Sequence, residues 1–216
     1  MTAELSFTEA FTSALRGTPA RVAHSSGESR MLPVETWSAD ADDSDHALLD
    51  LCRGSTLDIG CGPGRLTHEL TRRGHRTLGV DVVEEAVHLT RRRGAAAMLA
   101  DVFHPLPWEG RWGTALLADG NVGISGDPVH LLRRVRHLLH PGGRAVVEVS
   151  GPGTTSSVGW SRLELEHGRS RPFRWAFLAV DDVATVALAA GLLLTSVHRL
   201  APHEGARWAA VLDGPP

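Results

Sequence analysis

The stretch Leu57 to Arg65, which reads Leu-Asp-Ile-Gly-Cys-Gly-Pro-Gly-Arg, carries most of the chemical information in this chain. Its apolar beginning predicts the end of a strand, and Leu66 to Arg73 behind it have helical spacing. Each glycine costs about 0.5–1 kcal/mol of backbone entropy in a regular element, so three in five residues indicate unusual dihedrals or a close approach of the backbone to a ligand. We therefore predict a ligand-binding corner between a strand and a helix.

The spacing of Gly60, Gly62 and Gly64 restricts the ligand. It is Gly-x-Gly-x-Gly, whereas the dinucleotide fingerprint is Gly-x-Gly-x-x-Gly/Ala, and the last position of that fingerprint holds Arg65 here. A bulky arginine at that position argues against a dinucleotide pyrophosphate.

A second feature follows about twenty residues downstream of the corner. Arg76 to Asp81 is a short apolar stretch that ends in an acid. A carboxylate at such a strand end can accept hydrogen bonds from a ribose diol. The alternative is that Asp81 caps the strand or forms a turn, which aspartate favours in any protein.

The order of these features resembles the class I S-adenosylmethionine-dependent methyltransferases. The resemblance rests on Asp58 two residues ahead of Gly60-Cys61-Gly62-Pro63-Gly64, and on the strand end Gly79-Val80-Asp81. It extends over roughly residues 45 to 150, through three further matches: Ala100-Asp101-Val102, Leu116-Leu117-Ala118-Asp119 and Leu138-Leu139-His140-Pro141-Gly142-Gly143.

The resemblance implies a set of residues around S-adenosylmethionine. Asp58 would orient the loop or, through water, contact the ammonium group, while the backbone of the glycine turn approaches the methionine part. Asp81 would accept from the ribose, and the residues after the third strand would meet the adenine. The implied cofactor-binding residues are Asp58, Gly60, Cys61, Gly62, Gly64, Asp81, Val82, Asp101, Val102, Phe103 and Asp119.

The methyl acceptor is less well specified. The fourth strand ends Ala118-Asp119-Gly120-Asn121 and lacks the Asn/Asp-Pro-Pro-aromatic signature of nucleic-acid and protein amide methyltransferases, which favours a small-molecule acceptor. Positioning and exclusion of water can suffice for methyl transfer without a strong base. The candidate catalytic residues are His104, Asp119 and Asn121, and the candidate substrate-binding residues are Trp37, Asn121, Trp160 and Arg174.

Two alternatives stay open. One is an NAD-dependent oxidoreductase on a similar corner, against which Arg65 and the Pro-Gly-Gly before the fifth strand argue. The other is a protein that binds S-adenosylmethionine without catalysis, because no unambiguous catalytic base is visible.

Composition limits the class of protein. The chain has 216 residues, of which 42% are hydrophobic, enough for one sizeable core. A net charge of −3 creates no general field for nucleic acid. Two cysteines without zinc spacing predict neither a disulfide framework nor a metal site. No stretch approaches the ~20 apolar residues of a membrane span, and the first residues lack a signal-peptide pattern, so we expect a cytoplasmic protein. We also expect a monomer or a homodimer, with no nucleic-acid or membrane partner.

Alternating strands and helices must position these residues. Periodicity predicts helices at 66–73, 84–93, 127–140 and 181–190, and strands at 76–81, 96–100, 112–119 and 144–150. This pattern is typical of an α/β fold with a doubly wound, mostly parallel, Rossmann-like sheet. The resemblance implies seven strands and an antiparallel end, for which 192–200 and 207–212 are the candidate pair.

Two segments lie outside this core. Residues 1–44 are expected to form a cover, with a helix at 2–16 followed by an extended part containing a short strand or turn, and the main domain at 45–216 begins with a helix capped by Ser44 or Asp45. Residues 151–179 are expected to be a hairpin-like insertion, with strands at 160–166 and 170–177. We predict that cover and insertion form walls of the acceptor pocket, although packing on the distal side of the sheet or a dimer contact is also compatible with their aromatic and arginine residues.

Overall fold

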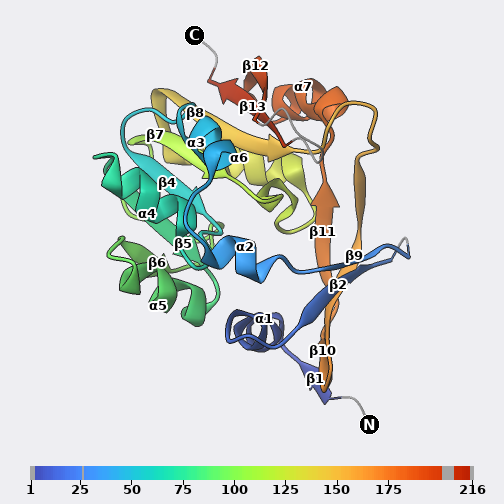
Figure 1. Ribbon diagram of the computed structural model, residues 1–216. Coiled ribbons are helices and arrows are strands. Elements are labelled where there is room, and N and C mark those ends of the chain that lie inside the picture. Colours follow the sequence, from blue (N-terminus) through green and yellow to red (C-terminus); the bar gives the residue numbers. More distant parts are fainter. Residues whose placement is uncertain (1–2, 26, 201–206, 215–216) are drawn as a thin grey trace.

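The computed structural model describes residues 3–25, 27–200 and 207–214. Its main element is a seven-stranded sheet with the order β12-β13-β8-β7-β4-β5-β6 (Figure 1). The strands are β4 (Thr56–Ile59), β5 (Thr77–Asp81), β6 (Ala97–Leu99), β7 (Trp112–Leu117), β8 (Leu139–Val149), β12 (Leu193–Arg199) and β13 (Trp208–Asp213). Strands β4 to β8 are parallel, and β13 is antiparallel to both of its neighbours, β8 and β12. The predicted doubly wound, mostly parallel sheet with an antiparallel pair at one end is confirmed.

Helices cover both faces of this sheet. They are α3 (Asp43–Leu49), α4 (Arg65–Arg72), α5 (Glu84–Arg92), α6 (Pro128–Leu138) and α7 (Val180–Ala189), with a short 3-10 turn η1 (Asn121–Gly123). Successive residues of β7 alternate between two buried clusters, because side chains of a strand point to opposite faces. Leu117 packs with residues of α6 and α7, and Leu116 packs with residues of α3 and α4.

A second sheet stands beside the carboxyl edge of the first. It contains β1 (Ala3–Leu5), β2 (Ala20–His24), β3 (Ser29–Met31), β9 (Ser157–Leu165), β10 (Gly168–Ser170) and β11 (Phe173–Phe177). The helices α1 (Phe7–Leu15) and α2 (Val34–Ser38) accompany it, and Figure 1 shows both between the second sheet and α5. The cover and the insertion therefore build one structure together. A boundary between domains at residue 45 stays a prediction.

Several predicted boundaries were wrong for local reasons. The first helix begins after Ser6, whose side chain accepts from the Glu9 N–H, and the residues before it form β1 on β10. Helix α2 was not predicted. The cap of α3 is Asp42, which accepts from the Asp45 N–H at 2.9 Å, and not Ser44 or Asp45.

The insertion has the expected strands, but its second strand is broken at Arg171-Pro172 into β10 and β11. Helix α6 ends at Leu138, and Pro141-Gly142-Gly143 lies within β8. Gly143 is needed there because a Cβ would fall 2.7 Å from the Trp112 carbonyl oxygen. Among the described residues, no helix is both long and apolar enough to cross a membrane.

Candidate functional site

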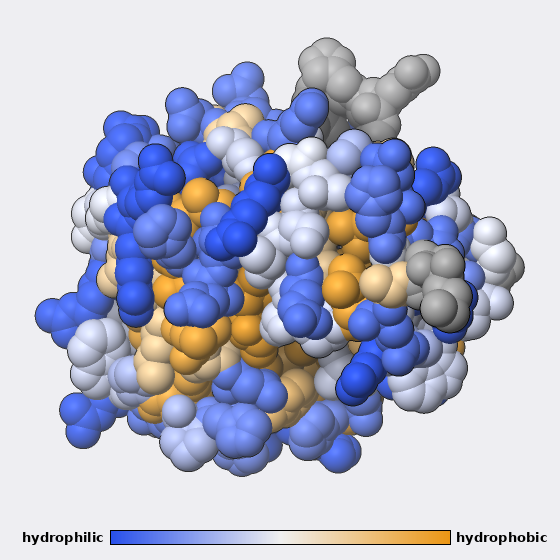
Figure 2. Space-filling view, turned by 90° about the horizontal axis from the view of Figure 1, so that it is seen from below, coloured by the Kyte–Doolittle hydropathy of each residue, from blue (hydrophilic) through white to orange (hydrophobic). Residues whose placement is uncertain are grey.

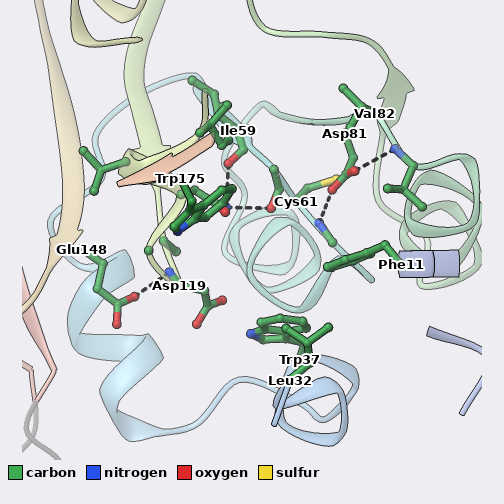
Figure 3. A pocket seen from close by; sticks show the side chains of 18 of the residues that line it. Phe11, Leu32, Trp37, Ile59, Cys61, Asp81, Val82, Asp119, Glu148 and Trp175 are labelled. Atoms are coloured by element: carbon green, nitrogen blue, oxygen red, sulfur yellow. Dashed lines mark hydrogen bonds between the residues drawn. The ribbon is translucent and has the colours of Figure 1, made fainter. Parts of the chain in front are cut away.

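A cavity of about 760 Å³ lies where the carboxyl ends of β4, β5, β7 and β8 face the second sheet. Seen from below, this side of the molecule has apolar surface gathered in a hollow with hydrophilic residues around it (Figure 2). Figure 3 shows Asp81 and Val82 at one end of the cavity, Asp119 and Glu148 at the other, and Trp37 and Trp175 facing the space between them.

The three glycines of the corner are required for three different reasons. A Cβ at Gly60 would fall 2.6 Å from the Asn121 amide nitrogen, and one at Gly64 would fall 2.6 Å from the Thr90 hydroxyl. A Cβ at Gly62 would meet no atom within 4 Å, and Gly62 lines the cavity. Only the missing side chain of Gly62 therefore leaves room for a ligand, whereas Gly64 does not line the cavity and serves packing against α5.

Backbone donors of the corner are already used inside the protein. The N–H groups of Gly60 and Cys61 donate to the Val80 carbonyl at 2.8 and 3.1 Å, and that of Gly62 donates to the Asp81 carboxylate at 2.9 Å. The Cys61 thiol is buried 3.7 Å from the Thr90 hydroxyl. The corner thus offers the cavity a surface without side chains, and not a set of free N–H donors.

Asp58 lies beneath the corner. It is 1% exposed, and the Thr67 hydroxyl donates to its carboxylate at 2.6 Å. Burial raises the pKa of Asp58 to about 6, although the hydrogen bond from Thr67 acts to lower it. This position suits a residue that holds the start of α4 against the corner.

Asp81 faces the cavity from the end of β5. Its two oxygens accept from the N–H groups of Gly62 and Val83, each at 2.9 Å. Burial raises the pKa of Asp81, while these N–H groups act to lower it. Val82, Asp101 and Val102 line the cavity as well.

Phe103 and His104 do not line the cavity, which differs from their predicted roles at the adenine and at the acceptor. The Phe103 ring is stacked on His130 with centroids 4.8 Å apart. The His104 ring lies 3.4 Å from an Asp101 oxygen and its side chain is 76% exposed. Because the turn after β6 directs both side chains away from the strand end, neither reaches the space where an acceptor would sit.

A network of two arginines and three acids lies at the other end of the cavity. Arg65 is 4% exposed and contacts Asp45 and Asp119, the latter at 2.8 Å. Arg207 binds both oxygens of Glu148, at 2.7 and 2.8 Å, and one of Asp45 at 2.6 Å. Burial acts to lower the pKa of Arg207, but its contacts with Glu148, Asp45 and Asp119 together outweigh this and raise the pKa, so the guanidinium stays charged.

Asp119 belongs to this network and also lines the cavity. Its backbone has a φ of 52°, and its N–H donates to Glu148 at 2.8 Å. Burial, and then the charge of Glu148, raise the pKa of Asp119. The sequence indicated Asp119, but not the network members Asp45 and Arg207, which are far from it in the chain.

Asn121 holds the corner. Its amide nitrogen donates to the carbonyls of Ile59 and Gly60, both at 2.9 Å. That nitrogen is therefore not available to an acceptor.

The second sheet and its helices roof the cavity with aromatic rings. Ring centroids are 5.9 Å apart between Trp37 and Phe11, 5.5 Å between Phe11 and Phe7, 4.9 Å between Phe7 and Phe173, and 6.1 Å between Phe173 and Trp175. We call these five residues the aromatic roof. Trp37 was predicted as a substrate-binding residue, and the insertion that carries Phe173 and Trp175 was predicted as a wall of the acceptor pocket; Phe7 and Phe11 were not predicted there.

The two predicted residues of the insertion lie differently. Trp160 and Arg174 are directly paired across β9 and β11, and the Arg174 Cζ lies 5.5 Å from the Trp160 ring. Trp160 is 52% exposed and does not line the cavity; Arg174 does, but its guanidinium is turned to Trp160. Trp175, and not Trp160, is the tryptophan of the insertion that lines the cavity. The alternation Phe-Arg-Trp-Ala-Phe over 173–177 was the signal in the sequence that could have found it.

In the described part of the chain, no three His, Cys, Asp or Glu side chains are grouped as a metal ion would require.

Comparisons with known proteins agree with this geometry. Residues 56–143 match a family model described as a methyltransferase domain. A tabtoxin biosynthesis enzyme from Pseudomonas amygdali pv. tabaci is 34% identical over 85 residues, which are 39% of this chain and 29% of that protein. The match thus spans less than a third of the length of this curated relative.

Solved structures share the fold over more of the chain. A SAM-dependent methyltransferase from Bacteroides fragilis, in complex with S-adenosyl-L-homocysteine, has a TM-score of 0.77 at 18% identity and covers 98% of this chain and 97% of its own. The 1,6-didemethyltoxoflavin-N1-methyltransferase of Burkholderia thailandensis has a TM-score of 0.61 at 21% identity, with 84% and 82% covered. Residues 56–143 are thus similar in sequence to a methyltransferase domain, and the chain shares the fold of these S-adenosylmethionine-dependent methyltransferases.

Proposed function

We propose that this chain transfers a methyl group from S-adenosylmethionine to a small-molecule acceptor. The observation that carries the proposal is that a single cavity joins the glycine corner and Asp81 to an aromatic-roofed space at the neighbouring strand ends. Its volume of about 760 Å³ lies in the upper part of the ~300–1,000 Å³ range of ligand cavities, so it is large enough for a cofactor with space beside it.

The residues at one end fit the cofactor. The open space over Gly62 would admit the methionine part, and Asp81 would accept from the ribose hydroxyls. Asp101 and the Val102 N–H would meet the adenine, with Val82 packing on it, and Asp119 would lie near the ammonium group. Asp58, Gly60, Cys61 and Gly64 would act by holding the corner in shape.

S-adenosylmethionine supplies a methyl group on a sulfonium, which a nucleophile of the acceptor takes in an in-line displacement that breaks the C–S bond and leaves neutral S-adenosylhomocysteine. The protein's task is then to orient the acceptor and exclude water. The aromatic roof supplies the water-free wall. Asp119 would hold the acceptor or take its proton, because it lines the cavity and its burial raises the pKa of its carboxyl group.

The names of similar proteins support a small acceptor. One structural neighbour is a 1,6-didemethyltoxoflavin-N1-methyltransferase with that compound bound, and another is a glycopeptide N-methyltransferase. A natural-product or metabolic intermediate is the acceptor class we propose. We predict from the sequence that the protein is a monomer or homodimer in the cytoplasm and that it binds neither nucleic acid nor membrane.

Titration calorimetry with S-adenosylmethionine, S-adenosylhomocysteine and NAD tests the cofactor. We expect both sulfur compounds to bind and NAD to give no heat; binding of NAD alone would contradict the proposal. Transfer of labelled methyl from S-adenosylmethionine to a panel of small molecules then tests catalysis. Cofactor binding without transfer to any acceptor would favour a non-catalytic binding protein.

A further inference from the structure

The order of the strands in the main sheet locates the part of the cavity that is left for the acceptor. Asp81 ends β5 and Glu148 lies near the end of β8, and the order β8-β7-β4-β5 separates them by three strand spacings, about 14 Å. Under the proposed function, on which this inference rests, the cofactor runs from Asp81 over β4 toward β7. The space beyond, over the end of β8, is left for the acceptor, and we call it the acceptor end.

One arginine of the second sheet, Arg30, lies at the acceptor end of the cavity. Arg30 on β3 is paired with Val22 of β2, which is paired with Leu163 of β9, so all three share the cavity face of the second sheet. The Arg30 Cζ lies 5.2 Å from the Phe177 ring centroid. The next residue, Leu178, accepts from the Ser150 N–H just after β8, which places Arg30 at the acceptor end.

The other charges near this end are already matched. Arg65 and Arg207 contact Asp45, Asp119 and Glu148, and Arg174 turns its guanidinium to the outer face. Within the described residues, Arg30 has its contact with Phe177 and no carboxylate partner. Asp119 and Glu148, by contrast, both have guanidinium partners, so among the described residues Arg30 is the charged side chain at the acceptor end that has no partner of opposite charge.

We propose that the methyl acceptor is a flat aromatic molecule that carries an anionic group, such as a carboxylate, sulfonate or phosphate. Its ring packs against Trp175 and Phe177, and Arg30 binds the anion. A guanidinium stacked on an aromatic face keeps its N–H groups in its own plane, where they can still donate to an anion. Since Arg30 is exposed, the anion keeps part of its hydration and pays little desolvation. An aromatic molecule that carries an alkylammonium group would be repelled by the same cation.

Two fluorescent dyes that differ by one charged group test this directly. 8-Anilinonaphthalene-1-sulfonate is an anion with a flat naphthalene ring, and N-phenyl-1-naphthylamine is its neutral counterpart without the sulfonate. Both are titrated into the full chain with saturating S-adenosylhomocysteine, so that the cofactor end is filled. We expect Arg30→Met to weaken binding of the sulfonate by about tenfold and to leave the neutral dye within about twofold, because one charge-assisted interaction is lost.

Arg21→Met is the matched control. Arg21 lies on the paired strand but on the outer face, where it donates to Ser29 at 3.1 Å. It should leave both dyes unchanged. Equal weakening of both dyes by Arg30→Met, or of neither, would overturn the inference.

A turnover assay distinguishes this inference from the proposed function. With paired aromatic acids and their methyl esters as acceptors, Arg30→Met should raise the KM of the acids about tenfold and leave kcat and the esters nearly unchanged. Preference for arylalkylamines, which are cationic, over aromatic acids would overturn the inference alone. Failure of S-adenosylhomocysteine to bind would overturn the proposed function and this inference with it.

Discussion

The glycine corner and the aromatic roof face each other across one cavity, but they are built in different ways. The corner is formed by nine consecutive residues, 57–65, together with Asp81 and Asn121, and it presents backbone to the cavity. The roof presents aromatic side chains from two segments about 140 residues apart, which meet when β2 pairs with β9. Under the proposed function, the cofactor would bind to a surface made by local geometry, and the acceptor to one made by long-range assembly.

The corner and the roof are also held to the rest of the protein by different kinds of interaction. The corner is held by hydrogen bonds of buried groups, such as Thr67 to Asp58 and Asn121 to Gly60. Helix α1 of the roof is joined to α5 by an ion pair of Arg16 and Glu85 at 2.7 Å, in which Arg16 is 65% exposed. An exposed ion pair contributes little to stability, so we expect the α1 side of the roof to open more readily than the corner.

The largest effect is expected on ligand affinity when Gly62 is replaced, and a control variant distinguishes loss of ligand contact from backbone strain. Gly62→Asn fills the open space with a side chain that tolerates positive φ, and should weaken S-adenosylhomocysteine binding at least about 100-fold. Gly74→Asn is the control, since Gly74 has a φ of 84°, open space around it and no part in the cavity. Calorimetry and melting curves of both variants check this. Equal affinity in the two variants would show that no ligand lies over Gly62.

Asp81 gives the next largest effect. Asp81→Ala should raise the Kd of S-adenosylhomocysteine by about tenfold to 100-fold, because charge-assisted hydrogen bonds of about 1.5–3 kcal/mol each would be lost. Asp127→Ala is the control, since it removes a carboxylate that accepts a backbone N–H, from His130, away from the cavity. An unchanged Kd for Asp81→Ala would refute its assignment to the ribose.

Asp58 provides a pH test of the corner. Its pKa is raised to about 6 in the folded protein, so the stability it contributes is fully present below about pH 4 and is lost as the pH rises through 6. Asp58→Asn still accepts from Thr67 but cannot ionise. Relative to the wild type, the variant should gain on the order of 2 kcal/mol of unfolding free energy between pH 4 and 7. Denaturant titrations across this range measure it, and a difference that does not vary with pH would contradict the prediction.

The smallest effect comes from a comparison of the cavity face and the outer face of the second sheet. Trp175→Leu should lower acceptor turnover about tenfold and leave the Kd of S-adenosylhomocysteine within about twofold, because only the acceptor loses its wall. Trp160→Leu, on the outer face of the neighbouring strand, should change neither. If both variants lose turnover equally, the roof acts through its stability and not through contact.

The sequence by itself determined the corner and the sheet. Glycines that need positive φ, an acid at a strand end, and alternating strands and helices are local signals, since each depends on neighbours within a few residues. The same reasoning found the insertion's strands and Trp37, and it located Asp119 at the end of β7.

Only the tertiary structure decided which side chains face the cavity. Trp160 and Trp175 are both aromatic strand residues, yet the register of β9 against β11 turns one out and one in, and a shift of one residue would exchange the faces. Arg207 reaches Glu148 and Asp45 only because β13 lies beside β8. Such contacts join residues 59 and 162 positions apart, and their geometry depends on packing of the whole chain, which no local pattern encodes.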